Sequence, residues 1–267
     1  MIDRGKRSLL GVDIDAVDYD AAIERIMTAA LEERAYSVSA LAVHGVMTGV
    51  QDPQHRHRLN ALDMVTPDGQ PVRWGLDAIH QTDLPGKVSG PNLTRRLLVR
   101  AARDGIPVFF YGSTEATLEQ VKSRLSIDLP RLSIAGTESS KFRRISRDEK
   151  RALVERIRGS GAKLTFVGLG CPRQEIFVYE FTRELGMPTF AVGAAFDYLA
   201  GNAKQPSELA QRLGLQWLHR LLDDPRRLWR RYLVLNPLYL VMATRQKMGL
   251  TASRPAPEPP AHEELFA

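Results

Sequence analysis

The sequence has a single cysteine, Cys171, among its 267 residues. One cysteine cannot form an intramolecular disulfide, which excludes a disulfide-stabilised secreted scaffold and favours a reducing, cytoplasmic setting. Apolar runs are short as well, because no window offers the roughly 20 apolar residues that a membrane-spanning helix needs. The basic N-terminus is followed by only a few apolar residues before Asp13, which fits neither a secretory signal nor a transmembrane helix.

Familiar metal and nucleophile motifs are also missing. The six histidines show neither H-x-x-H nor H-E-x-x-H spacing, and there is no G-x-S-x-G elbow and no Walker loop. Asp13 and Asp15 form the D-x-D pattern with which many sugar-nucleotide enzymes hold a divalent metal. Here the pattern ends the first expected strand, where Asp15 can simply cap or turn the chain. We therefore expect no metal site and no cofactor.

Positive charge is concentrated near the C-terminus. The net charge is +6, and residues 205–250 contain eight lysines and arginines but only three acidic residues. The rest of the chain is nearly neutral. A basic segment of this kind binds anionic partners such as lipid headgroups, phosphorylated substrates or nucleic acid.

Strand and helix patterns alternate along residues 1–204. This alternation predicts an α/β core with a Rossmann-like, doubly wound and mainly parallel sheet. The expected strands are residues 8–12, 35–43, 62–65, 108–111, 132–135, 164–167 and 189–192. The expected helices are residues 18–30, 52–60, 70–79, 92–103, 115–125, 146–158 and 172–185. Ser146 and Glu149 have the spacing of a capping box.

The pattern changes after about Asn202. Residues 209–222 and 225–235 are expected to be helical, and the helix should restart after Pro237 over residues 238–242. Arginines beside tryptophans and tyrosines are typical of helices at a membrane surface. A helical hairpin packed on the core is the alternative. We assign residues 205–250 to a basic, amphipathic, membrane-docking appendage and expect residues 251–267 to be a disordered tail.

Three glycines, Gly112, Gly168 and Gly193, each follow an expected strand and precede a helix. They should therefore lie together at the carboxyl ends of the strands, where such folds bind ligands. The longest junction is G-L-G-C-P-R-Q-E, in which Pro172 opens a helix. A Gly-rich turn into a helix N-terminus suits a diphosphate or a nucleotide, although such turns also close ordinary strand–helix units. Cys171 can be a nucleophile there or, as we favour, a small side chain in a crowded turn.

Asp68 in T-P-D-G-Q-P is the best candidate for acid/base chemistry. It follows the end of an expected strand, and Gly69 leaves space for a ligand beside it. Asp-Gly is also a common turn sequence, so a purely structural turn is the alternative.

Six blocks of the sequence carry a resemblance. They are T-P-D-G-Q-P-V-R-W, V-S-G-P-N-L, V-F-F-Y-G-S, F-V-G-L-G-C-P-R-Q-E, A-V-G-A-A-F-D-Y-L-A-G and R-L-G-L-Q-W-L-H-R-L-L-D-D-P-R-R-L-W-R-R-Y. In this order they resemble the WecB/TagA/CpsF family of glycosyltransferases (family 26). The resemblance implies a Rossmann-like core and a C-terminal appendage that docks on the membrane and helps to complete the active site. It also implies metal-independent, inverting transfer of a sugar from a UDP-sugar to a polyprenyl-diphosphate-linked acceptor.

The resemblance also implies roles for individual residues. Asp68 matches the family's proposed general base, which takes the acceptor hydroxyl's proton as the oxygen attacks the anomeric carbon. Gln174 matches a residue near the donor. Arg220, Arg227 and Arg230 match appendage arginines that reach the diphosphate and offset the charge on the UDP leaving group. The other expected substrate-binding residues are His44, Lys87, Asn92, Gly112, Gly168, Gly170 and Arg173.

The sequence departs from the family pattern where the sugars are expected. Ala40 and Ala42 stand where many members have a Thr-x-Asn pair, and Lys87 stands where arginine is common. Polar contacts to the sugar or the acceptor are therefore missing or replaced, with His44 as a candidate substitute. An N-acetylmannosamine-type sugar, glucose and a uronic acid all stay open as the sugar transferred.

Two functions from different classes remain. The first is a glycosyltransferase of surface-polysaccharide synthesis, peripheral on the inner face of the plasma membrane. Its expected partners are the UDP-sugar, the polyprenyl-diphosphate-linked acceptor and the anionic membrane surface, without nucleic acid, and self-association into a homo-oligomer stays open. The second is a non-catalytic nucleotide- or nucleic-acid-binding protein with a basic C-terminal tail.

Overall fold

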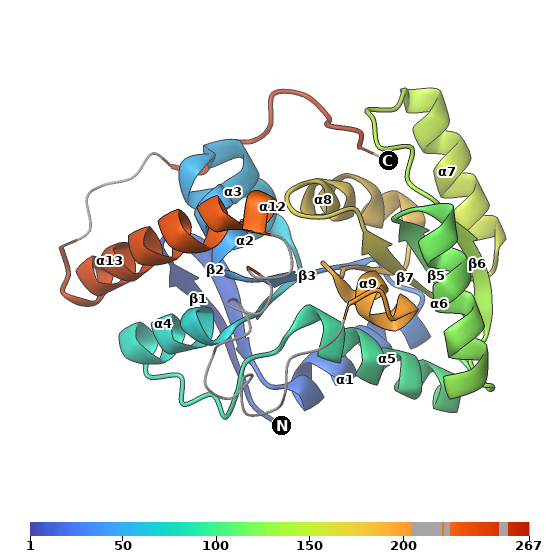
Figure 1. The fold of residues 1–267 in the computed structure, drawn as a ribbon, viewed down its shortest axis with the longest axis horizontal. Helices are drawn as coiled ribbons and strands as arrows, with labels where there is room; N and C mark the ends of the chain where they lie inside the picture. Colours follow the sequence, from blue (N-terminus) through green and yellow to red (C-terminus); the bar gives the residue numbers. More distant parts are fainter. Residues whose placement is uncertain (204–220, 222–224, 251–255, 267) are drawn as a thin grey trace.

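The structure, a computed structural model, describes residues 1–203, 221, 225–250 and 256–266. Its centre is a six-stranded parallel sheet, with helices on both faces and the strand order β4-β3-β8-β7-β5-β6 (Figure 1). The strands are β3 (Tyr36–Leu41), β4 (Met64–Pro67), β5 (Val108–Gly112), β6 (Ile134–Glu138), β7 (Leu164–Gly168) and β8 (Pro188–Ala191). The predicted α/β class with a parallel sheet is confirmed.

Strand β5 illustrates why the sheet is covered on both sides. All its residues are buried, and successive side chains of a strand point to opposite faces. Tyr111 belongs to the core on one face, where its ring stacks on Phe177. Phe110 belongs to the core on the other face, where its ring stacks on Phe166. Side chains therefore fill both faces, and the strand ends are left as the place where polar groups can gather.

Helices connect these strands, most of them close to the predicted positions. They are α1 (Tyr19–Leu31), α2 (Val43–Gln51), α3 (Pro53–Ala61), α4 (Gln70–His80), α5 (Gly90–Asp104), α6 (Glu115–Asp128), α7 (Arg147–Gly159), α8 (Arg173–Leu185) and α9 (Ala195–Ala200). The capping box of Ser146 and Glu149 at α7 is confirmed. The sequence missed α2, because glycines lower helix propensity. Gly49 packs closely there, since an added Cβ would lie 2.9 Å from the end of the Leu59 side chain.

A β-hairpin of β1 (Asp3–Leu9) and β2 (Val12–Val17) precedes the sheet. The prediction of one strand over residues 8–12 is wrong, because the chain reverses direction at Leu10 (φ 57°) and Gly11 (φ 84°). Positive φ angles at both residues of a two-residue turn match the twist of paired strands. Leu10 is itself buried, so the run L-L-G-V has the apolar character of a strand although a turn divides it.

The C-terminal segment contains α12 (Pro225–Trp229), the π-helical stretch Arg230–Val234 and α13 (Leu235–Lys247). The helix therefore does not restart at residue 238, and α13 already begins at Leu235. Helix α13 lies beside α2 and α4, and the buried Tyr239 donates its hydroxyl hydrogen to the Pro71 carbonyl at 2.9 Å. The helix expected over residues 209–222 falls outside the described residues, apart from Leu221.

Residues 256–266 run as an irregular segment from near α3 toward α7, and the last of them, 264–266, contact the core (Figure 1). The expected disorder of residues 251–267 stays a prediction. Leu265 is buried, and its carbonyl accepts the Ile145 N–H at 2.9 Å. Glu264 forms an ion pair with Arg58 at 2.8 Å. The Pro- and Glu-rich composition is typical of disorder, but the final residues find specific partners on the folded core.

Candidate functional site

A cavity of about 1090 Å³ opens at the carboxyl ends of the parallel strands. Residues that follow β3, β4, β5, β7 and β8 line it, together with Phe142 from the β6–α7 loop and residues of the C-terminal segment. In open parallel sheets this edge is where ligands bind, because strand-to-helix turns and helix N-termini meet there.

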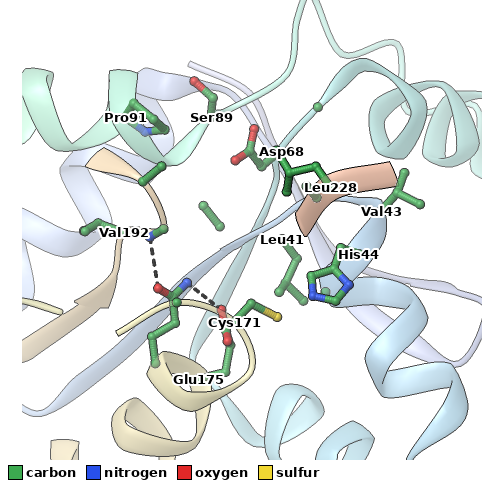
Figure 2. Close-up of a pocket in the computed structure, with 18 of the residues that line it drawn as sticks. Leu41, Val43, His44, Asp68, Ser89, Pro91, Cys171, Glu175, Val192 and Leu228 are labelled. Atoms are coloured by element: carbon green, nitrogen blue, oxygen red, sulfur yellow. Dashed lines mark hydrogen bonds between the residues drawn. The ribbon is translucent and has the colours of Figure 1, made fainter. Parts of the chain in front are cut away.

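Asp68 stands in the wall of this cavity directly after β4. Its backbone N–H donates to the Leu41 carbonyl at 3.1 Å, which ties it to the neighbouring strand β3. The Gly90 N–H, at the start of α5, lies 3.4 Å from Asp68 Oδ2. Figure 2 shows the carboxylate facing the same open space as the side chains of His44 and Leu228. The geometry therefore offers a positioned carboxylate to a ligand in the cavity.

Two further sugar-site candidates, His44 near the start of α2 and Asn92 in the first turn of α5, also line the cavity. Lys87 does not line it, which differs from the prediction of a substrate contact. Its side chain is buried, and burial lowers its pKa, whereas the nearby Asp68 carboxylate opposes this shift. Lys87 therefore lies close enough to Asp68 for the two charges to interact, and its contact with a substrate stays a prediction.

The Gly-rich junction after β7 forms the floor of the cavity through Gly168, Gly170 and Arg173. Gly170 has a φ of 76°, and a cis peptide bond joins Cys171 to Pro172 before α8 begins. The Gln174 N–H donates to the Gly170 carbonyl at 3.0 Å. The chain is therefore turned tightly so that the N-terminus of α8 faces the cavity.

Gln174 lines the cavity but its amide is used within the protein. Its Nε2 donates to Glu175 Oε1 at 2.8 Å, and its Oε1 accepts the Gly193 N–H at 3.2 Å (Figure 2). Glu175 is buried and also accepts the Ser39 hydroxyl hydrogen at 3.1 Å. Burial raises the Glu175 pKa. These bonds fasten the β7–α8 and β8–α9 junctions to β3.

The three glycine junctions meet as predicted, but Gly112 is not part of the cavity wall. Gly112 pairs with Gly168 in the sheet, and the Ser113 N–H donates to the Gly168 carbonyl at 2.9 Å. A Cβ added to Gly112 would lie 2.6 Å from that carbonyl oxygen. Gly112 is therefore needed for the close approach of two backbones rather than for contact with a ligand.

The appendage arginines are described only in part. Arg230 begins the π-helical stretch and lines the cavity. Arg227 lies in α12, and its side chain is outside the described structure, as is the whole of Arg220. No helix in the described ranges is both long and apolar enough to cross a membrane.

Several cavity residues escaped the sequence analysis. Thr114, Thr117, Asp197 and Tyr198 lie at the starts of α6 and α9, and Phe142 lies in the irregular β6–α7 loop. The block A-V-G-A-A-F-D-Y contained a signal for two of them, because it follows a strand end. For Phe142 the sequence offered no periodic or motif signal.

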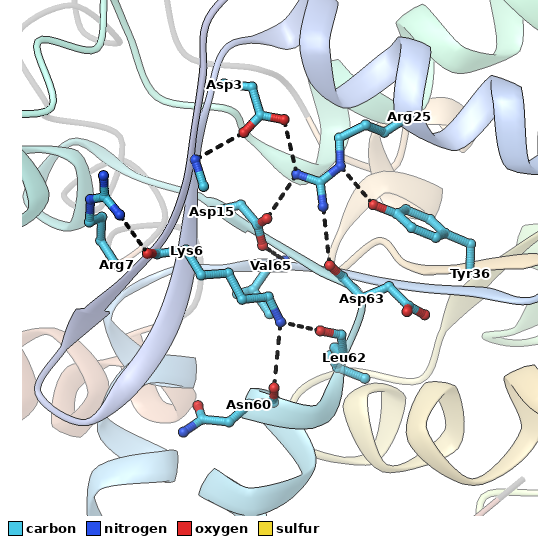
Figure 3. A network of polar contacts seen from close by, with 11 residues as sticks. Asp3, Lys6, Arg7, Asp15, Arg25, Tyr36, Asn60, Leu62, Asp63 and Val65 are labelled. Carbon is cyan, nitrogen blue, oxygen red and sulfur yellow. Dashed lines mark hydrogen bonds and ion pairs between the residues drawn. The ribbon is translucent and has the colours of Figure 1, made fainter.

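The D-x-D pair has a structural place away from the cavity (Figure 3). Asp15 is buried and accepts hydrogen bonds from Arg25 Nη1 at 2.9 Å and from the Val65 N–H at 2.8 Å. Burial raises its pKa, and these two donors oppose that shift. Asp15 therefore neither caps nor turns the chain but fastens β2 to α1 and β4. Within the described ranges, no group of three or more acidic, histidine or cysteine side chains could hold a metal ion.

A sequence model of the family described as "Glycosyl transferase WecG/TagA/CpsF family" matches residues 7–253 of this chain. The match covers the core with its cavity and the segment that contributes α12 and α13.

Proposed function

The chain belongs to the WecG/TagA/CpsF family of glycosyltransferases, a family involved in lipid-linked polysaccharide synthesis, and we propose that it transfers a sugar from a UDP-sugar to a polyprenyl-diphosphate-linked sugar with inversion at the anomeric carbon. Membership of this family makes the chain an enzyme, and the alternative of a non-catalytic binding protein is set aside. The observation that carries the proposal is that Asp68 shares one cavity with the Gly168 junction and with Arg230.

Asp68 is the proposed general base. The hydroxyl oxygen of the acceptor attacks the anomeric carbon, its proton passes to Asp68, and the bond from that carbon to the diphosphate breaks with its electron pair leaving on UDP. One such displacement inverts the anomeric centre. Two other carboxyl groups line the cavity. Glu175 already accepts hydrogen bonds from Ser39 and Gln174. Asp197 lies in α9 after β8, so it does not occupy the motif position after β4 that Asp68 occupies.

The leaving group is the second requirement of this reaction. UDP gains negative charge as the bond breaks, and fixed positive charge or backbone N–H groups must stabilise it. Arg173 at the N-terminus of α8 and Arg230 in the C-terminal segment are the cationic side chains available in the described cavity. We assign the diphosphate to the space between them. We propose that Arg220 and Arg227 also reach the diphosphate.

We propose that no divalent metal takes part. Asp13 and Asp15 form the pattern that holds a metal in many sugar-nucleotide enzymes, but here Asp15 is occupied by the Arg25 guanidinium and the Val65 N–H. The lining of the cavity contains neither member of the pair.

A membrane-facing role for α12 and α13 is also part of the proposal, because the acceptor is a lipid. One side of this segment packs on the core through Tyr239, but other apolar side chains are 41–58% exposed. They are Trp229, Leu233, Val234, Leu238, Leu240 and Val241, of which Val234 and Leu238 also line the cavity and the other four do not. Arg226, Arg230, Arg245 and Lys247 accompany them. Exposed apolar groups beside cations suit the surface of an anionic bilayer on the cytoplasmic side.

The identity of the sugar depends on the part of the cavity next to Asp68. Ala40 and Ala42 line it with methyl groups that cannot form hydrogen bonds, whereas His44 brings an imidazole. Because Ala40 and Ala42 offer no side-chain hydrogen bond, this wall does not select one sugar, and an N-acetylmannosamine-type sugar, glucose and a uronic acid all stay candidates.

The test is a donor screen with the full chain. A synthetic polyprenyl-diphosphate sugar, a panel of UDP-sugars and EDTA are combined, and UDP release is followed with and without the acceptor. Release that requires the acceptor and one donor supports the proposal and names the sugar. UDP release that occurs only after Mg²⁺ is added would contradict the proposal that no divalent metal takes part. No release with any donor, with or without Mg²⁺ and lipid, would contradict the proposed donor and acceptor.

A further inference from the structure

Phe142 is a half-exposed aromatic residue in the wall of the cavity. Its backbone is in the left-handed region, with a φ of 53°. A bulky residue adopts positive φ only when its surroundings hold it there, and such strained positions occur preferentially at ligand sites. The ring is 55% exposed, so burial in the core does not account for this conformation.

The loop that carries Phe142 is held from the cavity side. The Ser140 N–H donates to the Ser113 carbonyl at 3.1 Å, and Ser140 Oγ accepts the Phe142 N–H at 2.9 Å. Next to the ring, the Arg143 guanidinium and the Lys141 ammonium both pair with Glu149 in the first turn of α7. The cations on either side of Phe142 are thus drawn toward α7, and the ring is the group that the loop presents to the cavity.

The same loop is held from outside by the C-terminal residues. The Ile145 N–H donates to the Leu265 carbonyl, and Arg144 forms a β-bridge with Phe266. Leu265 is buried, Glu264 pairs with Arg58, and Glu263 pairs with Lys150. Arg58 and Lys150 are themselves buried, so the acidic side chains that reach them are fixed in place.

Phe142 and Asp68 lie toward opposite ends of the cavity. Asp68 follows β4, at one edge of the sheet, and Phe142 follows β6, at the other edge. Five strand spacings separate these edges, or roughly 24 Å at about 4.8 Å each. A sugar beside Asp68 leaves the diphosphate near the centre of the sheet, at Gly193 and Arg173, and the nucleoside near β5 and β6.

We infer that Phe142 is the platform on which the nucleobase of the donor stacks, and that residues 256–266 hold this platform in position. The inference rests on the proposed nucleotide-sugar donor. An aromatic face attracts any base, so the platform supplies affinity rather than base selectivity. The competing occupant is the acceptor sugar, whose apolar face can also lie on an aromatic ring.

Binding to the full chain tests the platform. UDP, uridine and inorganic diphosphate are titrated by calorimetry into the unaltered protein, Phe142→Leu, Phe142→Tyr and the surface control Ile127→Leu. We expect Phe142→Leu to weaken UDP and uridine binding roughly ten-fold, with diphosphate binding unchanged. Phe142→Tyr, which keeps the ring, and Ile127→Leu should bind as the unaltered chain does.

The other possible results contradict either the stacking role of Phe142 or the proposed donor. UDP affinity that Phe142→Leu leaves unchanged would overturn the inference alone, and so would an equal loss of diphosphate binding. A higher KM for the acceptor with an unchanged KM for the donor would place the ring in the acceptor site instead. No UDP binding by the unaltered chain would overturn the proposed donor itself.

The role of the tail is tested separately. Leu265→Ala removes the buried anchor of the tail without touching the cavity, and Leu250→Ala removes an exposed leucine that precedes the tail and does not line the cavity. We expect Leu265→Ala to weaken UDP and uridine binding but not diphosphate binding, and Leu250→Ala to change none of them. Normal uridine affinity in Leu265→Ala would contradict the assigned role of the tail.

Discussion

Gln174 and Glu175 are adjacent in the sequence, and the side-chain amide of Gln174 donates to the buried carboxyl of Glu175 at 2.8 Å. The other end of this amide accepts the Gly193 N–H, so the pair joins two ligand-binding junctions. Because Ser39 also donates to Glu175, the pair ties these junctions to strand β3. The cavity floor is therefore fixed before any ligand arrives.

Replacing Glu175 with alanine should loosen this floor. Two buried donors, on Ser39 and Gln174, would lose their acceptor, which costs about 1–3 kcal/mol in the free energy of unfolding. Urea unfolding measures this loss, and Glu119→Ala on the exposed face of α6 is the control. A Glu175→Ala variant as stable as the control would show that the pair does not stabilise the fold.

Gly112 should tolerate no side chain. Gly112→Ala places a Cβ 2.6 Å from the Gly168 carbonyl oxygen in a backbone with φ of 108°. Gly161→Ala is the matched control, because it has φ of 79° but open space around the added Cβ. The control should lose about 1–2 kcal/mol from backbone strain alone, and Gly112→Ala distinctly more. Equal losses in thermal unfolding would refute the steric explanation.

Stability should fall in mild acid because of His55. This histidine is buried, and burial lowers its pKa from 6.5 to about 4, with Arg58 and His44 lowering it further and Asp52 opposing them. Below pH 6.5 the unfolded chain binds a proton that the folded chain does not, so stability is lost as the pH falls from 6.5 to 4. The loss amounts to about 3 kcal/mol.

His55→Leu tests this effect, because neither ring nitrogen of His55 has a hydrogen-bond partner in the described structure. Unfolding measured between pH 7 and pH 4 should show a flatter dependence in this variant. His262→Leu, in the exposed part of the tail, is the control and should follow the unaltered chain. A His55→Leu curve parallel to that of the control would contradict the assignment.

Liposome binding should depend on the outer side of α13. Leu240 and Val241 are exposed and do not line the cavity, so replacing both with serine leaves the site intact. Each apolar side chain contributes about 1.5–3 kcal/mol when it leaves water completely, so sedimentation with anionic liposomes should drop at least ten-fold. The same change at Ile127 and Val99, two exposed residues on α6 and α5, is the control. Unchanged sedimentation would contradict the proposal that α13 contacts the membrane.

The sequence was sufficient for features that depend on local patterns. The strand-to-glycine pattern correctly predicted that Gly168 and Gly193 lie together at the carboxyl ends of the strands. The spacing of Ser146 and Glu149 correctly identified a helix start. Features that depend on distant contacts could not be predicted. The burial of Asp15 depends on Arg25 in the next helix and on Val65, which is 50 residues away, and the contact of Glu264 with the core depends on the distant Arg58.

The same limit applies to the site. Asp68 became a candidate because a motif surrounds it, whereas Phe142 became one only through its place in the cavity wall. Lys87 and Gly112 were expected at the ligand, and these contacts stay predictions, because the structure shows only that Lys87 is buried near Asp68 and that Gly112 packs closely on Gly168. Composition and spacing do not distinguish a residue that touches a ligand from one that supports its neighbour.

The most direct test of the account compares Asp68→Asn with Asp197→Asn, which replaces a second carboxylate in the same cavity. Transfer kinetics and UDP binding are measured for both, using the donor and acceptor that the screen identifies. We predict that Asp68→Asn lowers kcat by about 10²–10⁴-fold and leaves UDP affinity nearly unchanged. Asp197→Asn should keep kcat within a few-fold of the unaltered enzyme. Near-normal turnover by Asp68→Asn would contradict the proposed role of Asp68.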